Sequence, residues 1–217
     1  MPRLYAVGDI HGCLGHLENL MREVPIARED TVVFIGDYID RGPDSRGVVD
    51  YVLDFRRHHP QTVCLKGNHE DMLLDFLEKR GEYGPGVFLY NGGGATLGSY
   101  GLSPHHPSPS LPPEHLQFFR TLKLTHEQGG FLFVHGGLKP EVPLEKQEKH
   151  DLLWIRDEFF GWEHELGLTV VFGHTPMVRI FLNPPWSIGI DTGAVYGGKL
   201  TCVELADGEV KATYQAG

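Results

Sequence analysis

The sequence has little cysteine, few basic residues for its acidity and no long apolar run, and each shortage excludes a class of protein. Its three cysteines, Cys13, Cys64 and Cys202, are odd in number and widely separated, which fits neither a disulfide framework nor a paired-cysteine metal site. The 19 basic residues are outnumbered by 29 acidic residues, and the net charge of −10 argues against binding to nucleic acid or to an acidic membrane surface.

The chain also lacks targeting and membrane-spanning segments. Its N-terminus does not read as a secretory signal, and no run of about 18 apolar residues could form a transmembrane helix. We therefore expect a cytoplasmic protein with no membrane partner. The remaining composition, 41% hydrophobic and 22% charged over 217 residues, is typical of a globular chain. We interpret residues 1–217 as a single domain that acts as a monomer.

The first third of the chain repeats one pattern three times. Short apolar runs rich in β-branched residues predict buried strands, a polar loop containing glycine follows each strand, and apolar residues at helical spacing follow each loop. The predicted strands cover residues 4–7, 31–35 and 62–65, and the predicted helices cover 14–21, 48–53 and 72–77. This order predicts a parallel sheet whose three polar loops meet at one edge.

The second half predicts another sheet that packs on the first. Residues 81–113 are rich in glycine, proline and serine, so we expect a surface insertion in which His105 and His106 are exposed to solvent. A short helix from Pro113 to Leu122 follows it. The later β-like runs are expected to pair mainly antiparallel, and they cover residues 131–134, 168–172, 178–182, 187–190, 199–205 and 209–214.

Acidic and histidine side chains stand directly after the predicted strands. Asp9 and His11 follow the first strand, two residues apart, so an extended segment points both side chains to the same side. A carboxylate and an imidazole make a suitable mixed ligand pair for a divalent metal. Asp37 follows the second strand, and its two carboxylate oxygens can bridge two cations.

Three further candidate ligands follow later strands. Asn68 offers an amide oxygen after the third strand, while His135 and His174 follow the apolar runs at 131–134 and 170–172. Five separate segments therefore bring six potential ligands to strand ends, each close to a glycine. A set of oxygen and nitrogen ligands arranged in this way predicts a two-metal centre.

The motifs around these residues resemble the signature set of one family, the phosphoprotein phosphatases among the calcineurin-like metallophosphoesterases. The resemblance is closest to compact bacterial and phage-lambda-type serine/threonine phosphatases. The motifs that carry it read GDIHG at 8–12, GDYIDRG at 36–42, GNHE at 67–70, HGG at 135–137 and GHTP at 173–176.

The resemblance implies an α/β fold in which two mixed β-sheets pack as a sandwich flanked by helices. It also implies a centre of two divalent metal ions, for which we expect manganese, with iron or zinc as alternatives, because the ligands are mixed oxygen and nitrogen donors without cysteine. Carried onto this sequence, the first metal is held by Asp9, His11 and Asp37, and the second by Asp37, Asn68, His135 and His174.

The resemblance further implies the roles of the remaining site residues. Water held between the metals attacks phosphorus directly, and His69 protonates the leaving group as a general acid. Asp40 fixes the tautomer of His69 and keeps its ring charged. The phosphate is bound by Arg41 and Arg156, whose planar donor forks suit its oxygens, together with Asn68.

These roles predict a serine/threonine protein phosphatase that acts on phosphoproteins, with phosphotyrosine and small aryl phosphates as further substrates. The main alternative is a symmetrical dinucleoside polyphosphate hydrolase, acting on diadenosine tetraphosphate, or another nucleotide phosphohydrolase. The familiar bacterial form of that enzyme lacks an acid at the position of Asp40, so Asp40 and Glu70 favour the protein phosphatase. A catalytically silent binding subunit is disfavoured, because every expected ligand is present.

Overall fold

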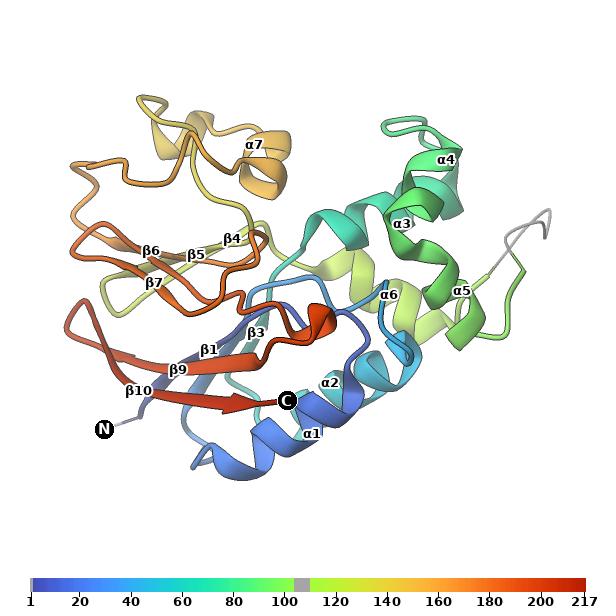
Figure 1. Cartoon of the computed structure of the whole chain (residues 1–217), viewed down its shortest axis with the longest axis horizontal. Helices are drawn as coiled ribbons and strands as arrows, with labels where there is room; N and C mark the ends of the chain where they lie inside the picture. Colours follow the sequence, from blue (N-terminus) through green and yellow to red (C-terminus); the bar gives the residue numbers. More distant parts are fainter. Residues whose placement is uncertain (1, 104–109) are drawn as a thin grey trace.

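The structure, a computed structural model, describes residues 2–103 and 110–217 of the chain. Two five-stranded sheets lie face to face, and helices flank the pair on both sides (Figure 1). The expected α/β fold, with two mixed sheets packed as a sandwich and flanked by helices, is therefore confirmed.

The first sheet combines three parallel strands with an antiparallel pair from the end of the chain. β1 (Leu4–Val7), β2 (Thr31–Phe34) and β3 (Thr62–Cys64) are parallel neighbours, as predicted. β9 (Leu200–Ala206) pairs antiparallel with β1, and β10 (Glu209–Ala216) pairs with β9. We expected these last two strands in the second sheet, but they cover the edge of β1 that β2 leaves free.

The second sheet is parallel at its centre and antiparallel at its edges. In spatial order it contains β4 (Thr125–Gln128), β5 (Phe131–Val134), β6 (Thr169–Phe172), β8 (Ser187–Gly189) and β7 (Phe181–Asn183). β5, β6 and β8 are mutually parallel. The expectation of mainly antiparallel pairing was therefore wrong here, because long crossover segments connect these strands and return the chain to the same end of the sheet.

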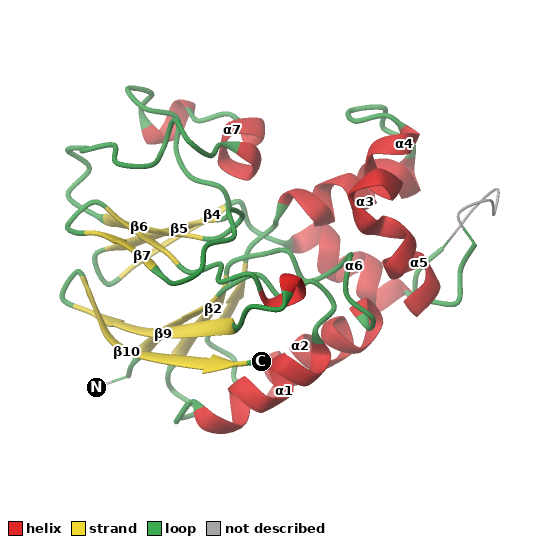
Figure 2. Cartoon of the chain, in the orientation of Figure 1, coloured by secondary structure: helices red, strands yellow, loops and turns green. Residues whose placement is uncertain are grey.

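Alternation along the strands divides the core into layers. In β1, Leu4 and Ala6 belong to the core between the sheets, whereas Tyr5 and Val7 belong to the core shared with the helices. Figure 2 shows the helices that share this second core below and beside the first sheet, and it shows α7 (Lys149–Trp154) above the second sheet. The helices that share a core with the first sheet are α1 (Leu14–Glu23), α2 (Ser45–His58), α3 (Asn68–Glu78) and α6 (Pro113–Thr121).

The segment expected to be a surface insertion is in large part packed against the helices. It contains α4 (Pro85–Phe88), a π-helical turn η1 (Leu89–Gly93) and α5 (Gly94–Ser99). Phe88 and Leu97 are buried in the same core as α3, so these apolar residues anchor the segment despite its many glycines. Residues 104–109, which include His105 and His106, lie outside the described residues.

Three smaller expectations can be compared with the structure. The strand expected over 178–182 begins only at Phe181, because Val178 lies in a fully exposed loop. The three cysteines are free, as their spacing predicted, and all three are buried. In the described ranges, no helix has the length and apolar character needed to cross a membrane.

Candidate metal centre

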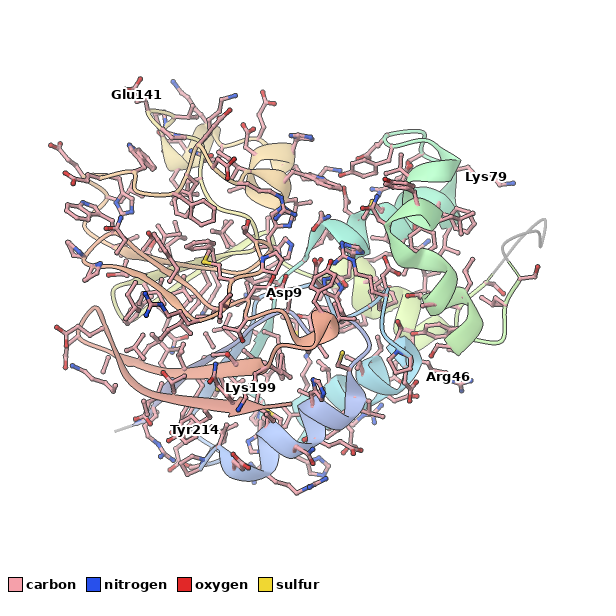
Figure 3. The ribbon with its side chains drawn as sticks, in the orientation of Figure 1. Asp9, Arg46, Lys79, Glu141, Lys199 and Tyr214 are labelled. Atoms are coloured by element: carbon pink, nitrogen blue, oxygen red, sulfur yellow. The ribbon has the colours of Figure 1, made fainter. Side chains whose placement is uncertain are left out.

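The candidate metal centre lies where six strands of the two sheets end. β1, β2 and β3 are parallel to one another, as are β5, β6 and β8, and the loops after them converge. Figure 3 places Asp9, the first of these loop residues, in the middle of the molecule between the sheets and the helices. The six predicted ligands come from these loops and all are buried: Asp9, His11, Asp37, Asn68, His135 and His174.

Asp37 lies between two groups of candidate ligands. One group joins it to His11 and His69, the other joins it to His135 and His174, and the ligand atoms within each group lie within 4.8 Å of one another. Asp37 Oδ2 is 3.4 Å from His11 Nε2, while Asp37 Oδ1 is 3.4 Å from His135 Nε2. The two carboxylate oxygens therefore face different groups, as a bridging ligand requires.

Electron-pair donors face one another in the second group. His135 Nδ1 lies 3.2 Å from the carbonyl oxygen of Ile35, so Nε2 is the ring nitrogen that faces the centre. It lies 3.0 Å from Asn68 Oδ1 and 3.4 Å from Asp37 Oδ1. Burial lowers the pKa of His135, but the charge and hydrogen bond of Asp37, together with Glu70 and the carbonyl oxygen of Ile35, outweigh this effect and the net shift is upward. The arrangement therefore favours a proton or a cation between these three atoms.

The other two histidines are held in the neutral form that binds metals. Burial lowers the pKa of His11 to about 3 and that of His174 to about 2. His11 Nδ1 lies 2.8 Å from the carbonyl oxygen of Ile39 and donates to it, which leaves the electron pair on Nε2 directed at Asp37.

Asp9 contacts the second group and keeps one oxygen without a partner. Its Oδ2 accepts the backbone N–H of His174 at 2.9 Å, while Oδ1 is buried without a hydrogen-bond partner. Burial, followed by the charges of Asp191 and Asp37, raises the pKa of Asp9 well above its usual value. An uncompensated buried carboxylate of this kind is stabilised by a cation. Asp191 had no predicted role, although it follows β8 as the candidate ligands follow their strands.

Backbone strain is concentrated at the same place. Among the described residues, eight non-glycine residues have positive φ, and five of them belong to the site. Such conformations cost free energy and persist only where the surrounding structure holds them, which is common at functional sites. The five residues and their φ angles are His11 (48°), Asp37 (51°), Asp40 (73°), Arg41 (68°) and His174 (65°).

Glycines beside the ligands allow the loops to approach closely. A Cβ atom on Gly67 would lie 2.0 Å from Asp37 Oδ1, and one on Gly173 would lie 2.1 Å from Asp9 Oδ1. Any side chain at these two positions would displace the carboxylates. The glycines that accompany the motifs are therefore explained by contact between loops from different strands.

His69 and Asp40 form a buried dyad at the edge of the first group. His69 Nδ1 lies 2.6 Å from Asp40 Oδ2, while His69 Nε2 is buried, has no hydrogen-bond partner and lies 3.9 Å from Asp37 Oδ2. Burial lowers the pKa of His69 to about 4 and raises the pKa of Asp40 well above its usual value. Burial thus favours the uncharged form of both groups, which opposes the charged ring that we expected Asp40 to maintain.

A further residue that sequence reasoning missed supports the dyad. Thr96 of α5 donates its hydroxyl to Asp40 Oδ1 at 2.5 Å, and its oxygen accepts the backbone N–H of Asp40 at 2.9 Å. Ser45 Oγ accepts the same N–H at 3.0 Å. The carboxylate of Asp40 is therefore fixed on one side by the segment that we expected to be a surface insertion.

Glu70 organises the loops without facing the centre. Its carboxylate accepts the backbone N–H groups of Asp37, Tyr38 and Gly67 at 2.8–3.0 Å. Glu70 thereby ties the loop after β2 to the start of α3. Its role is to hold the backbone of the site.

Both predicted arginines contact the site loops. The Arg41 guanidinium lies against His11 Nε2, and the backbone N–H of Arg41 donates to the carbonyl oxygen of Gly92 in η1. Arg156 Nη1 donates to the carbonyl oxygen of His174 at 3.0 Å and to Thr175 Oγ1 at 3.1 Å. Two cationic forks thus stand at the rim of the acidic centre, from loops on opposite sheets.

These observations fit a pair of divalent cations. An orphaned buried carboxylate oxygen on Asp9, facing electron-pair donors around His135 and a shared carboxylate on Asp37 all require positive charge at the centre. Carboxylate, amide and imidazole ligands without thiolate suit manganese, iron or zinc.

Comparison with known proteins also points to a phosphoesterase. The sequence profile of the family described as calcineurin-like phosphoesterases matches residues 2–210. Two relatives from Bacillus thuringiensis, strain Al Hakam and subsp. konkukian strain 97-27, are described as the asymmetrical bis(5'-nucleosyl)-tetraphosphatase PrpE. They are 26% and 28% identical to this chain, over 94% and 90% of it and 90% and 87% of their own length.

Solved structures show the same fold in proteins described as acting on different phosphate substrates. A crystal structure described, provisionally, as a diadenosine tetraphosphatase is 26% identical, has a TM-score of 0.75, and the match covers 100% of this chain and 96% of that chain. A protein-tyrosine phosphatase from a Shewanella species and a serine/threonine phosphatase from Saccharomyces cerevisiae share the fold at 17% identity. Their TM-scores are 0.68 and 0.66, over 100% of this chain and 81% and 80% of theirs. With a family profile over nearly its full length and the motif residues gathered at one centre, the chain belongs to the calcineurin-like phosphoesterase family.

Proposed function

We propose that this chain hydrolyses dinucleoside tetraphosphates at a centre of two divalent cations, with manganese as the first candidate. The observation that carries the two-metal chemistry is the position of Asp37, whose oxygens face two separate groups of ligands. When bound, the cations supply an activated water and neutralise the oxygens of the phosphate under attack. They would be held by Asp9, His11, Asp37, Asn68, His135 and His174.

The two arginines position the phosphate chain. Arg41 and Arg156 reach the rim of the centre from loops on opposite sheets, so their guanidinium groups can bind the phosphate chain from two sides. Charge accumulates on the phosphoryl oxygens during transfer, and preorganised donors stabilise it. In this proposal the arginines hold the phosphorus in line with the attacking water.

His69 delivers a proton to the departing oxygen. Its Nε2 is the one polar atom of the dyad without a partner, and it lies on the Asp37 side of the ring. A bound phosphate chain places negative charge beside the ring and raises its pKa, so the substrate itself favours the protonated form. Asp40 accepts from Nδ1 and thereby directs Nε2 at the substrate.

The names of the relatives support the nucleotide substrate. Both Bacillus proteins are described as asymmetrical tetraphosphatases, whereas our sequence analysis considered the symmetrical reaction. Asymmetrical cleavage of diadenosine tetraphosphate gives AMP and ATP, and symmetrical cleavage gives two molecules of ADP. Product analysis therefore separates the two reactions in a single assay.

The two acids that favoured a protein phosphatase do not bind the substrate directly. Glu70 is buried and accepts backbone N–H groups, and Asp40 is buried against Thr96 and His69. Neither carboxylate can contact the group that is attached to the phosphate. Glu70 would serve the hydrolysis of any phosphate ester or anhydride at this centre, whereas Asp40 would influence the choice of substrate only through His69.

A serine/threonine protein phosphatase is the second candidate, and the dyad is the observation that favours it. A serine alkoxide is a strongly basic leaving group, so it needs a general acid more than a nucleotide phosphate does. The pair of His69 and Asp40, with Nε2 left free, supplies that acid.

The deciding experiment compares the metal-loaded protein on diadenosine tetraphosphate and on a phosphoserine peptide, with chromatographic analysis of the products. We expect the higher kcat/KM on the dinucleotide, with AMP and ATP as products. A higher kcat/KM on the peptide would replace the proposal by the second candidate, and ADP as the product would replace asymmetrical by symmetrical cleavage.

A further inference from the structure

A hollow lies beside the metal centre, between two of the loops that build it. Its volume is about 320 Å³, and its walls include Pro176, Met177 and Val178 on one side and Gly193 and Tyr196 on the other. The first wall directly continues the loop of His174, and the second continues the loop of Asp191. None of the residues that line the hollow is charged.

Apolar side chains are exposed at the hollow. Val178 is fully exposed, and Tyr196, at the end of the short helix η3 (Ala194–Tyr196), is 62% exposed. Single exposed apolar residues are common, but two that face the same hollow next to a catalytic centre favour a ligand with an apolar face.

Hydrogen bonds within and between the two walls fix their positions. Met177 donates its backbone N–H to the carbonyl oxygen of Asp191 at 3.0 Å, and Gly193 donates to Asp191 Oδ1 at 2.9 Å. Gly198 donates back to Gly193 at 2.9 Å, which closes the turn around Tyr196. The hollow is therefore built by the same loops that position the site.

Arg41 connects the tyrosine to the metal centre. Its guanidinium carbon lies 5.6 Å from the centre of the Tyr196 ring, and the same guanidinium contacts His11. In Figure 1 the short orange-red helix η3 faces the blue loop that leads into α2. The Arg41 guanidinium thus lies between the aromatic ring and the candidate metal ligands. In a nucleotide, the ribose lies in the same way between the base and the phosphate.

We infer that this hollow is a nucleobase subsite, in which the base of a nucleotide packs on Tyr196 and Val178 while its phosphate lies at Arg41. The inference rests on the proposed function, which supplies a substrate that carries a base. Aromatic stacking accepts every base, and the uncharged walls offer no charged group that would select one. The subsite therefore contributes affinity for nucleotides without strong preference among the bases.

The test measures inhibition of p-nitrophenyl phosphate hydrolysis by AMP and by inorganic phosphate, with metal-loaded protein. The two inhibitors share the phosphate and differ in the nucleoside, so the ratio of their inhibition constants reports the contribution of the nucleoside, and its dependence on Tyr196 reports the part that comes from stacking of the base. We expect AMP to bind more tightly than phosphate, and Tyr196→Ala to reduce that preference by about 5- to 150-fold, the range for removing one stacked base. Tyr196→Trp should retain the preference, whereas Tyr196→Leu, which keeps an apolar wall without a π face, should lose most of it.

Tyr90→Ala is the matched control, because Tyr90 is also an exposed tyrosine, 91% exposed, but does not line the hollow. Equal inhibition by AMP and phosphate in the unsubstituted protein, or a preference for AMP that survives Tyr196→Ala, would overturn the inference. A preference lost with Tyr90→Ala and kept with Tyr196→Ala would also overturn it. The assay does not require hydrolysis of dinucleotides, so a subsite confirmed in this way beside a failed diadenosine tetraphosphate assay would reject only the proposed substrate.

Discussion

Asp37 is the residue at which the loss of one negative charge should affect the whole centre, because its two oxygens face different ligand groups. We expect Asp37→Asn to weaken both metal sites together, by about 100-fold or more, since changes even to outer ligands cost 10- to 100-fold. Metal content after dialysis against graded metal concentrations measures the effect. Asp54→Asn, an exposed change on α2, is the control. One ion lost with the other bound at unchanged affinity would show that Asp37 is not shared.

A substitution at His69 distinguishes two roles for this residue, general acid and metal ligand. Its Nε2 is close enough to Asp37 for either role. We expect His69→Asn to slow hydrolysis of a phosphoserine peptide far more than hydrolysis of p-nitrophenyl phosphate, whose leaving group departs with little protonation. The ratio of the two kcat values in variant and unsubstituted protein measures this difference. Two metals should remain bound. Equal slowing on both substrates would reject the general acid role, and loss of a metal would assign His69 as a ligand.

The residues that gather at the centre could be picked out one by one from the sequence, whereas their supporting partners could not. Each ligand follows a strand and stands near a glycine, a signal that is local in the sequence. Thr96 meets Asp40 across 56 positions, and no local pattern encodes that contact. Asp191 did carry the local signal, since it follows β8, but a lone acid after a short strand gives no sign of its proximity to Asp9.

At the scale of elements, α5 holds the dyad of His69 and Asp40 in place through the hydroxyl of Thr96. We expect Thr96→Val, which keeps the shape and removes the donor, to leave a buried oxygen of Asp40 unpaired and to lower the free energy of unfolding by about 1–3 kcal/mol. Turnover of the phosphoserine peptide should fall more than turnover of p-nitrophenyl phosphate, because the effect passes through His69. Denaturant unfolding and the two kcat values are the measurements.

Ser99→Ala in the same helix is the matched control for that prediction. Ser99 bonds Asp44 and Arg46, outside the site, so its loss should not alter the ratio of the two turnover rates. A Thr96→Val protein with an unchanged ratio would mean that α5 supports the fold without positioning the dyad.

The connection before β2 offers a test of stability against pH. Asp30 is buried and accepts the backbone N–H groups of Arg3 and Ala27 at 2.7 and 2.8 Å. Burial alone would raise the pKa of Asp30, but these bonds outweigh it, so the pKa lies below its usual value. The stabilisation is therefore complete above the unfolded pKa of about 3.9 and is lost as the pH falls through the folded pKa.

We accordingly expect Asp30→Asn to lower the free energy of unfolding by about 1–3 kcal/mol at pH 7 and by less below about pH 4. Denaturant unfolding at several pH values measures the difference. Asp207→Asn, at an exposed acid paired with Lys211, should change it by at most about 0.5 kcal/mol. A difference that grows as the pH falls would contradict the sign of the shift.

Helices and strands were predicted well where the spacing of apolar residues along the sequence identifies them. Sheet membership was predicted poorly where it depends on pairing between distant strands. The three parallel strands at the start of the chain follow from the repeated strand, loop and helix pattern. The antiparallel pairing of β9 with β1 joins residues about 200 positions apart, and hydrophobic alternation reads the same in either sheet. The packing of residues 81–103 was not predicted, because their many glycines and Pro85 are typical of a surface loop, whereas Phe88 and Leu97 anchor the segment in the core.

On the scale of the whole molecule, the net negative charge of the protein opposes binding of the proposed substrate, which is also negatively charged. A net charge of −10 repels a polyphosphate, and within the site Asp9 and Asp37 add to that repulsion. Arg41 and Arg156 alone only balance these two carboxylates. Divalent cations would make the local field positive although the surface as a whole stays acidic. In the proposed reaction, attraction of the substrate and activation of water would therefore depend on the same two ions.

The most direct test of this account is a titration of verified metal-free protein with manganese, following hydrolysis of diadenosine tetraphosphate. We predict no turnover without metal, full turnover only when two ions are bound per chain, and AMP with ATP as products. Full turnover in the metal-free protein, or at one bound ion per chain, would contradict the claim that a shared Asp37 builds a two-metal centre.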